Sequence, residues 1–403
     1  MPTTHGIGPQ QPATTTRTTT TPLSRSSHIT EVVTLEDVFA AYYDCRRHKR
    51  SKRSAVEYEM MYELNNLELW RELNNQTYTP TTSIVFCVTQ PKLREVFAAD
   101  FRDRVVHHLF INKILPTIEA RLTPCACSCR KGMGTFYGIR RVLKSMSNHS
   151  DGWYLKFDIQ NFFMSINKEI LLRLTEEVVK KAAKEDTGWW LWLAKTIIMH
   201  KPEENCVKHG DIHLWEKLPA PKSLFGIDCN TGLPIGNLPS QVLTLLYMDD
   251  FCKMIVKEIG NSDDFTMYAD DGIIVCDSKR KLLELLPKMR SYLKDERRLT
   301  LHPRKITIQR VRSGVTFIGY LVKGGILKPG RRTIHNAISV AKWWSELKNP
   351  AHEDKVRLRA RINSYYGLMR HTKSYKIRRK MWRTLKNYKG IISTNKYSKI
   401  KLS

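Results

Sequence analysis

Two adjacent aspartates in a short β-rich segment constrain this chain more than any other feature. The segment FTMYADDGIIVC (Phe265 to Cys276) has β-forming residues on both sides of Asp-Asp-Gly. Asp-Gly is a favoured pair in tight turns, so we expect a β-hairpin with Asp270 and Asp271 at its tip. Adjacent carboxylates repel each other unless a cation lies between them, although solvated Asp-Asp-Gly turns are also common.

A third carboxylate ends a second predicted strand, WYLKFD (Trp153 to Asp158). Side chains alternate along a strand, so Leu155 and Phe157 share one face and Asp158 lies on the other. A strand-end carboxylate beside the hairpin pair predicts a group of three. Such oxygen ligands suit two Mg²⁺ ions, with Mn²⁺ as an alternative. Two ions about 4 Å apart are typical of phosphoryl transfer.

The chain also carries a strong positive charge. Lys and Arg number 67 against 39 Asp and Glu, a formal net charge of +28. The last part, residues 330–403, holds 20 of the basic residues and 3 of the acids, with aromatic residues at helical spacing. Such a charge favours a nucleic-acid partner, with an anionic membrane surface or a ribosomal structural role as alternatives. We assign the aromatic residues to a helical core. Charge and carboxylates together indicate nucleotidyl transfer.

Composition and periodicity divide the chain into four parts. Residues 1–30 are rich in Thr, Ser and Pro and are expected to be disordered. Residues 31–150 predict helices and short strands, 151–329 an antiparallel sheet with helices and an insertion loop at about 202–231, and 330–403 a basic helical module. The expected helices lie within 29–73 and over 101–122, 168–184, 240–259 and 279–298, and the expected strands within 81–99, 153–158, 265–276 and 306–327.

Cysteine usage and hydropathy indicate the compartment. Nine cysteines, without a visible secretory signal, predict reduced thiols and a cytoplasmic location. Cys125, Cys127 and Cys129 lack the second cysteine pair of a zinc knuckle, so we interpret them as buried or incidental thiols. The most apolar stretch, residues 188–200, is too short to span a bilayer and contains Lys195, so no membrane association is expected.

These residues, in this order, resemble the reverse transcriptases. Tyr268 to Asp271 (YADD) resembles the family signature, and KFDIQNFF (Lys156 to Phe163) resembles its first carboxylate motif. The resemblance extends from about Phe86 onward. It implies an α+β right-hand fold with fingers in 31–150, a palm in 151–329 and a thumb in 330–403. It also implies an RNA-directed DNA polymerase in which Asp158, Asp270, Asp271 and the carbonyl of Ile159 bind the metals. The substrates would be an RNA template, a DNA or RNA primer and deoxynucleoside triphosphates.

The resemblance assigns roles to residues around the incoming nucleotide. Phe163 occupies the position of an aromatic gate that would clash with a ribose 2′-hydroxyl; the alternative is a core residue like Phe162. Arg94 and Arg104, rather than Arg102, resemble the fingers arginines that grip the triphosphate.

Further positions follow from the same resemblance. Lys305 matches a lysine proposed to protonate the leaving pyrophosphate. Phe317, Gly319 and Tyr320, in FIGY, resemble the hairpin that grips the primer. The adjacent histidines at 107 and 108 cannot share one helix face, so we interpret them as structural.

One motif departs from the common family pattern. Where Q-G-x-x-x-S-P is usual, the chain has Ile235, Gly236 and, at the end, Gln241. This I-G-x-x-x-S-Q pattern, with SCRKGMGT (residues 128–135), resembles the reverse transcriptases of diversity-generating retroelements. Those enzymes copy a template-repeat RNA with errors opposite adenine and act with a small basic accessory protein, the variability determinant. An aliphatic residue 235 loses the amide contacts of Gln near the nascent base pair, which would loosen discrimination.

Other interpretations remain open on the sequence alone. The chain could be a group II intron-like enzyme, although the residues after 329 leave little room for a maturase extension. A retron enzyme would be expected to keep the usual Gln-Gly motif. A defence-associated polymerase that makes untemplated DNA is a further alternative. From another class, a catalytically inactive RNA-binding protein of polymerase fold has no reason to retain three mutually repelling carboxylates.

Overall fold

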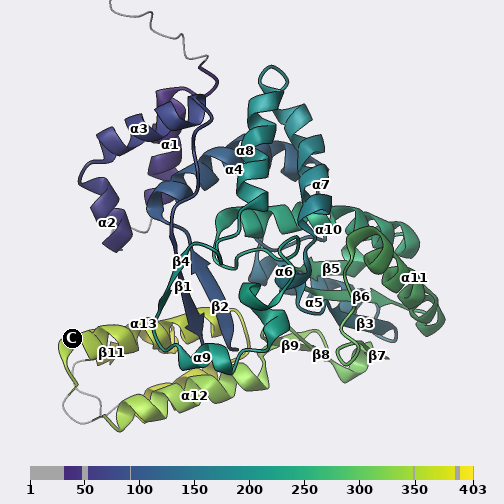
Figure 1. Ribbon diagram of the computed structural model, residues 1–403. Helices are drawn as coiled ribbons and strands as arrows, with labels where there is room; N and C mark the ends of the chain where they lie inside the picture. Colours follow the sequence, from purple (N-terminus) through teal and green to yellow (C-terminus); the bar gives the residue numbers. More distant parts are fainter. Residues whose placement is uncertain (1–30, 48–52, 91, 348–349, 386–390, 403) are drawn as a thin grey trace, which may run out of the picture.

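The computed structural model describes residues 31–47, 53–90, 92–347, 350–385 and 391–402 (Figure 1). The segment expected to be disordered, 1–30, and the middle of the basic run around residue 50 lie outside the described residues.

The N-terminal part is helical, as predicted. It consists of α1 (Leu35–Arg46), α2 (Arg53–Glu59) and α3 (Tyr62–Asn74), packed against the long helix α4 (Phe101–Arg121). Thr34 starts α1 through a capping box with Asp37. Buried Asn74 at the end of α3 accepts hydrogen bonds from the backbone amides of Val32 and Val33 and so holds the chain leading into α1.

A small sheet follows the N-terminal helices. Strands β1 (Ser83–Val88) and β2 (Arg94–Ala98) form the predicted antiparallel pair. The insertion at about 202–231, expected to be an irregular loop, contributes a third strand: β4 (Cys206–His209) pairs in parallel with β1. It also contains α9 (His213–Glu216), η1 (Ala220–Lys222) and η2 (Leu224–Gly226). Pairing between segments so distant in sequence leaves no local pattern, which is why β4 was not predicted.

The central sheet has the strand order β5-β6-β3-β7, and every neighbouring pair is antiparallel. Its strands are β3 (Trp153–Asp158), β5 (Phe265–Tyr268), β6 (Asp271–Cys276) and β7 (Thr307–Arg310). Leu155 and Phe157 join the large hydrophobic core, whereas Tyr154 joins a second cluster, so the predicted alternation along this strand is confirmed.

Helices cover both faces of the central sheet. The large core lies under α7 (Lys168–Ala182), α8 (Thr187–Met199), α10 (Leu238–Ile259) and α11 (Lys279–Arg297), together with α4. The second cluster packs α5 (Thr135–Asn148) against the other face. Short helix α6 (Phe162–Ser165) follows β3. No helix among the described residues is both long and apolar enough to cross a membrane.

The turn between β5 and β6 differs in detail from the prediction. Tyr268 pairs with Asp271, so the two turn residues are Ala269 and Asp270, and Asp271 is already the first residue of β6. Gly272 therefore lies in the strand. A Cβ there would lie 2.1 Å from the ring of Phe157, so this glycine serves close packing rather than the turn.

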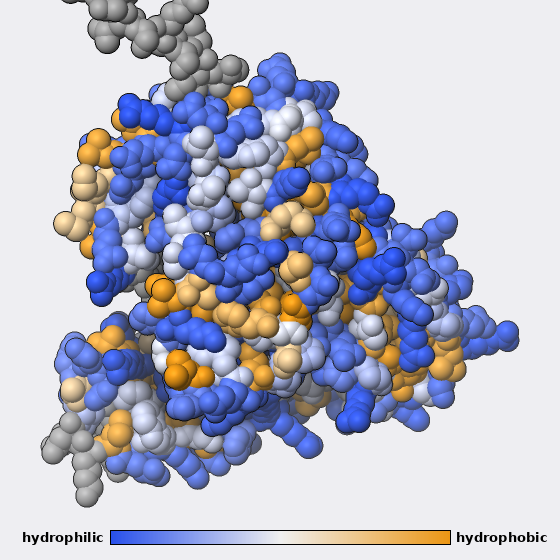
Figure 2. All heavy atoms as spheres, in the orientation of Figure 1, coloured by the Kyte–Doolittle hydropathy of each residue, from blue (hydrophilic) through white to orange (hydrophobic). Residues whose placement is uncertain are grey.

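The C-terminal part begins with the antiparallel strands β8 (Val315–Phe317), β9 (Tyr320–Lys323) and β10 (Ile326–Pro329). It continues with α12 (Arg331–Ser345), α13 (His352–Met369), α14 (Tyr375–Leu385) and a small sheet of β11 (Ile391–Ser393) and β12 (Ile400–Leu402). Trp344 and Tyr366 lie in the core of this module, as expected, whereas Trp343 is 53% exposed. Figure 2 shows a largely hydrophilic surface over α12.

Candidate active site

A cavity of about 610 Å³ lies where β3 ends beside the β5–β6 turn. It brings together residues that are far apart in the sequence. Seven of the predicted site residues line it: Arg94, Asp158, Ile159, Phe163, Ile235, Asp270 and Lys305.

The three predicted carboxylates lie on neighbouring backbone positions of the central sheet. Asp158 and Asp271 are direct cross-strand partners of β3 and β6, and Asp270 occupies the adjoining turn. The amide of Ile159 donates a hydrogen bond to the carbonyl of Asp270, with an N–O distance of 3.0 Å. This bond continues the β3–β6 pairing past the last ladder residue and fixes the turn against the end of β3.

The electrostatics of the group reflect its crowding. Burial, followed by the neighbouring carboxylates of Asp271 and Asp158, raises the pKa of Asp270 to about 6. Burial likewise raises the pKa of Asp271, opposed mainly by Lys156. Lys305 Nζ lies 2.7 Å from Asp158 Oδ2 and supplies one compensating positive charge.

The donor set fits divalent cations. Carboxylate oxygens are the ligands that Mg²⁺ prefers, and the raised pKa values of two of the three groups show that more positive charge would be accommodated there. Within the residues that the structure describes, no three His, Cys, Asp or Glu side chains already converge closely enough to hold an ion.

The two adjacent phenylalanines after β3 have different surroundings. Asn161 adopts a left-handed conformation with φ of 47° and starts α6. Phe162 is a buried member of the large core, whereas Phe163 is only partly buried. Both rings reach the cavity wall, but Phe163 has exposed surface available to a substrate.

The departing motif is tied to β2. The carbonyl of Ile235 accepts a hydrogen bond from the amide of Phe97, with an N–O distance of 2.8 Å. Gly236 has φ of 120°, and a Cβ there would lie 2.7 Å from the carbonyl oxygen of Phe97, so the close approach requires glycine. The Ile235 side chain lines the cavity and packs against an apolar cluster that includes Met164 and Leu224.

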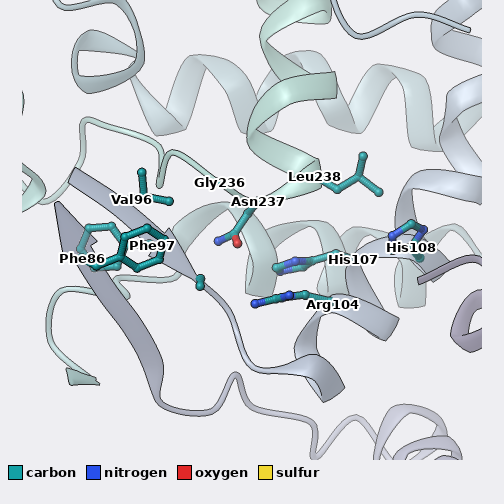
Figure 3. A pocket seen from close by; sticks show the side chains of 10 residues that line it. Phe86, Val96, Phe97, Arg104, His107, His108, Gly236, Asn237 and Leu238 are labelled. Carbon is teal, nitrogen blue, oxygen red and sulfur yellow. The ribbon is translucent and has the colours of Figure 1, made fainter. Parts of the chain in front are cut away.

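Arg104 lies elsewhere, so the expectation that it joins Arg94 is not met. It lines a separate cavity of about 230 Å³, in which Arg104 and His107 extend from α4 near Asn237 (Figure 3). Arg104 lies in the first turn of α4, and its Nε donates a hydrogen bond of 2.7 Å to the carbonyl of Ala99, just before the helix. Burial lowers the pKa of His107 to about 3, so this histidine is neutral.

The remaining predicted residues have structural contacts. Arg102 pairs with Glu72. Phe317 and Tyr320 are buried in the second cluster, and Tyr320 Oη donates to the carbonyl of Leu368 at 3.0 Å. Gly319 is exposed at the β8–β9 turn, and its carbonyl accepts hydrogen bonds from the amide of Gly330 and the hydroxyl of Thr333.

The cysteine cluster extends the central sheet. The backbone around Ala126 runs beside β5, with hydrogen bonds from Cys127 N to Met267 O and from Met267 N to Cys125 O. Cys125 and Cys127 are buried, and Cys129 is exposed.

Four basic residues of the cavity were missed by sequence reasoning. Lys92 lies two residues before Arg94 and had a visible signal, the basic pair in PKLR. Lys217, Lys222 and His302 had none, because they come from segments without a recognisable motif.

The sequence of the chain matches a known protein family. Residues 90–322 match the family described as reverse transcriptase (RNA-dependent DNA polymerase). Among curated proteins, none matches the sequence.

Three solved telomerase structures show limited similarity to the chain. That of Candida albicans, in complex with a fragment of telomeric RNA, has 10% identity and a TM-score of 0.40, covering 77% of this chain and 60% of that chain. The apo telomerase of Candida tropicalis has 12% identity and a TM-score of 0.44, covering 76% and 57%. Its form truncated from the C-terminal domain has 11% identity and a TM-score of 0.42, covering 62% and 55%. This chain thus spans less than two thirds of each telomerase chain.

The family match spans more than half of the chain, and its range contains every residue described above at the cavity. The chain therefore belongs to the reverse transcriptase family and has its right-hand polymerase fold.

Proposed function

We propose that Asp158, Asp270 and Asp271 are the metal-binding carboxylates of this polymerase, with the carbonyl of Ile159 as a further ligand. The observation that carries the proposal is their placement: two are cross-strand partners and the third adjoins them at a fixed turn. When bound, two Mg²⁺ or Mn²⁺ ions would activate the primer 3′-hydroxyl and stabilise the leaving pyrophosphate.

The other cavity residues then have defined roles. Lys92 and Arg94 bind the triphosphate of the incoming deoxynucleotide, and the exposed side of Phe163 excludes a ribose 2′-hydroxyl. Lys305, whose ammonium group lies 2.7 Å from Asp158, donates a proton to the leaving pyrophosphate. Arg104 lines the second cavity, so we do not assign it to the triphosphate.

We assign the residue ranges of the right hand accordingly. Residues 31–150 form the N-terminal helices and fingers, 151–329 the palm with its insertion at about 202–231, and 330–403 the thumb. The basic charge of the thumb suits the phosphate backbone of an RNA template with its primer.

We further propose that the enzyme is of the diversity-generating type, acting in the cytoplasm with a small basic accessory protein. It would copy a template-repeat RNA with errors directed to adenine. Support comes from Ile235, whose aliphatic side chain lines the cavity that also contains Phe163. An amide at that position would donate and accept hydrogen bonds that Ile235 does not offer, so base pairing is checked less strictly.

Sequencing of products from one defined RNA template tests this function. The template and a DNA primer are supplied with deoxynucleotides or with ribonucleotides, in Mg²⁺ or Mn²⁺. We expect DNA products only, with mismatches concentrated at template adenines. Evenly distributed rare errors would contradict the diversity-generating assignment, and untemplated products would favour the defence-associated alternative. Extension with ribonucleotides would contradict the role of Phe163.

A further inference from the structure

The insertion contributes two lysines to the catalytic cavity. Lys217 and Lys222 line the same cavity as Asp158 and Asp270, and both are exposed. The nearby carboxylates of Glu204 and Glu216 form salt bridges with Lys201 and His213 instead. Among the described residues, no salt bridge involves Lys217 or Lys222.

A buried carboxylate anchors the lysine-bearing segment. Glu95 in β2 is fully buried and accepts three hydrogen bonds from the insertion. The donors are Trp215 Nε1 at 2.8 Å, Ser223 Oγ at 2.7 Å and the amide of Leu224 at 2.9 Å. Because these donors lie on both sides of residues 217–222, the anchor fixes that stretch to the strand that begins with Arg94.

The stretch between the anchor points has its own order. The amide of Leu218 donates to Trp215 O at 3.1 Å, and the amide of Lys222 donates to Pro219 O at 2.8 Å. Leu224 packs with Phe97 in the apolar cluster that Ile235 also contacts. The insertion is thus built into the wall of the cavity, and its lysines project from fixed turns.

The charge balance of the cavity identifies the ligand. Two carboxylates that line the cavity, Asp158 and Asp270, and the adjoining Asp271 face five cationic side chains, which are Lys92, Arg94, Lys217, Lys222 and Lys305. This excess suits a polyanion. The cavity volume of about 610 Å³ lies in the range of small-molecule sites. A nucleoside triphosphate meets both conditions better than a nucleic-acid strand, which needs an extended groove.

We propose that Lys217 and Lys222 bind the polyphosphate of the incoming nucleoside triphosphate from the side of the insertion, and that Glu95 is the residue that positions them. This inference rests on the proposed function, because it assumes that the cavity is the nucleotide site. It makes the insertion part of the substrate-binding apparatus of the enzyme.

Steady-state primer extension with the double variant Lys217→Ala/Lys222→Ala tests the inference. Loss of binding shared by ground state and transition state raises KM without lowering kcat. We expect KM for deoxynucleotides to rise about tenfold, with kcat changed less than about twofold, and product inhibition by inorganic pyrophosphate to weaken about as much. Lys217→Arg/Lys222→Arg should restore most of the affinity. The matched control is Lys180→Ala/Lys181→Ala, two exposed lysines of α7 outside the cavity, which should leave KM unchanged.

The positioning role of Glu95 has its own test. Glu95→Gln replaces a carboxylate that accepts three hydrogen bonds by an amide that also carries donors. It should raise KM in the otherwise native enzyme but add little in the Lys217→Ala/Lys222→Ala background. Additive effects of Glu95→Gln and the lysine changes on KM would show that Glu95 does not act through these lysines.

The outcomes separate this inference from the proposed function. An active enzyme whose KM is unchanged by Lys217→Ala/Lys222→Ala overturns the inference alone. Weaker binding of the primer–template, with a smaller salt dependence and an unchanged KM, would assign the lysines to nucleic acid and also overturn it. Native protein that cannot extend a primer with deoxynucleotides would instead refute the proposed function.

Discussion

The catalytic cavity has two walls that are built in different ways. One wall is a continuous antiparallel ladder, in which Asp158 and Asp271 are neighbours by strand register. The other is assembled from β2, the insertion and the segment of Ile235, which are joined by the hydrogen bonds of Glu95 and by the apolar cluster around Leu224. The carboxylates lie on the wall whose geometry one sheet determines, and the proposed selectivity contacts lie largely on the assembled wall.

This difference suggests a division of effects. Changes to the sheet wall should act mainly on the rate of the chemical step, since the proposed metal ligands lie on it. Changes to the assembled wall should act on substrate affinity and on the choice of base.

The largest effect is expected on the sheet wall. Asp270→Asn removes a metal-binding carboxylate, so DNA synthesis should fall by roughly three orders of magnitude or more. Binding of RNA, measured by filter binding, should persist because the basic thumb is intact. Asp295→Asn is the control, since this carboxylate accepts a hydrogen bond from Ser291 on the surface of α11. Full activity of Asp270→Asn would refute the assignment of the metal site.

The same substitution should stabilise the protein. The pKa of Asp270 in the fold is about 6, above its value of about 3.9 in an unfolded chain. The folded state therefore binds the proton more tightly, and the free energy of unfolding contributed by this group falls as pH rises through the window from about 4 to 6.

Asn cannot ionise, so Asp270→Asn should exceed the native protein in stability by about 1–3 kcal/mol at pH 7.5 without metal, and by much less at pH 4. Thermal unfolding at the two pH values measures this difference. Added Mg²⁺ should raise the midpoint of the native protein more than that of the variant. A stability difference that does not change with pH would show that burial and the neighbouring carboxylates do not raise the pKa of Asp270 in the fold.

The two walls also differ in how far the sequence predicts them. β3, β5 and β6 were predicted with nearly correct bounds, because alternation of apolar residues is a local signal. The turn was placed about one residue too late, because Asp271-Gly272 resembles a turn pair while Gly272 is needed beneath the ring of Phe157. Local sequence patterns were therefore enough to predict the secondary structure of the wall that carries the carboxylates.

The assembled wall depends on contacts that have no local pattern. Glu95 looks like a solvated charge in the sequence but is fully buried and meets donors more than a hundred residues away. The pairing of β4 with β1 and the positions of lysines 217 and 222 at the cavity also depend on such long-range contacts. Neither was predicted. The family resemblance assigned Arg104 to the triphosphate, but the structure places it in a separate cavity. Sequence spacing alone does not reveal that separation.

A moderate effect is expected at Phe163, which lies where the two walls meet. Phe163→Ala should reduce discrimination against ribonucleotides by about 10- to 100-fold, because the ring would no longer exclude the 2′-hydroxyl. Competition between deoxy- and ribonucleotides in primer extension measures this ratio. The neighbouring Phe162→Leu tests the alternative core role, since it should lower the melting temperature without changing sugar selection. Equal discrimination in native enzyme and Phe163→Ala would contradict the gate.

The smallest effect is expected at Ile235, on the assembled wall. Ile235→Gln should lower misincorporation opposite template adenine by a few-fold, since the amide restores polar contacts near the nascent base pair. Ile235→Leu keeps the apolar contact with Met164 and Leu224 and should leave the error spectrum unchanged. Sequencing of cDNA copied from one adenine-rich RNA compares the three enzymes. If Gln and Leu shift the spectrum alike, the cause is packing in the apolar cluster. If Ile235→Gln changes only kcat and leaves fidelity intact, the assembled wall does not control the choice of base at this residue, and the proposed division of effects is wrong there.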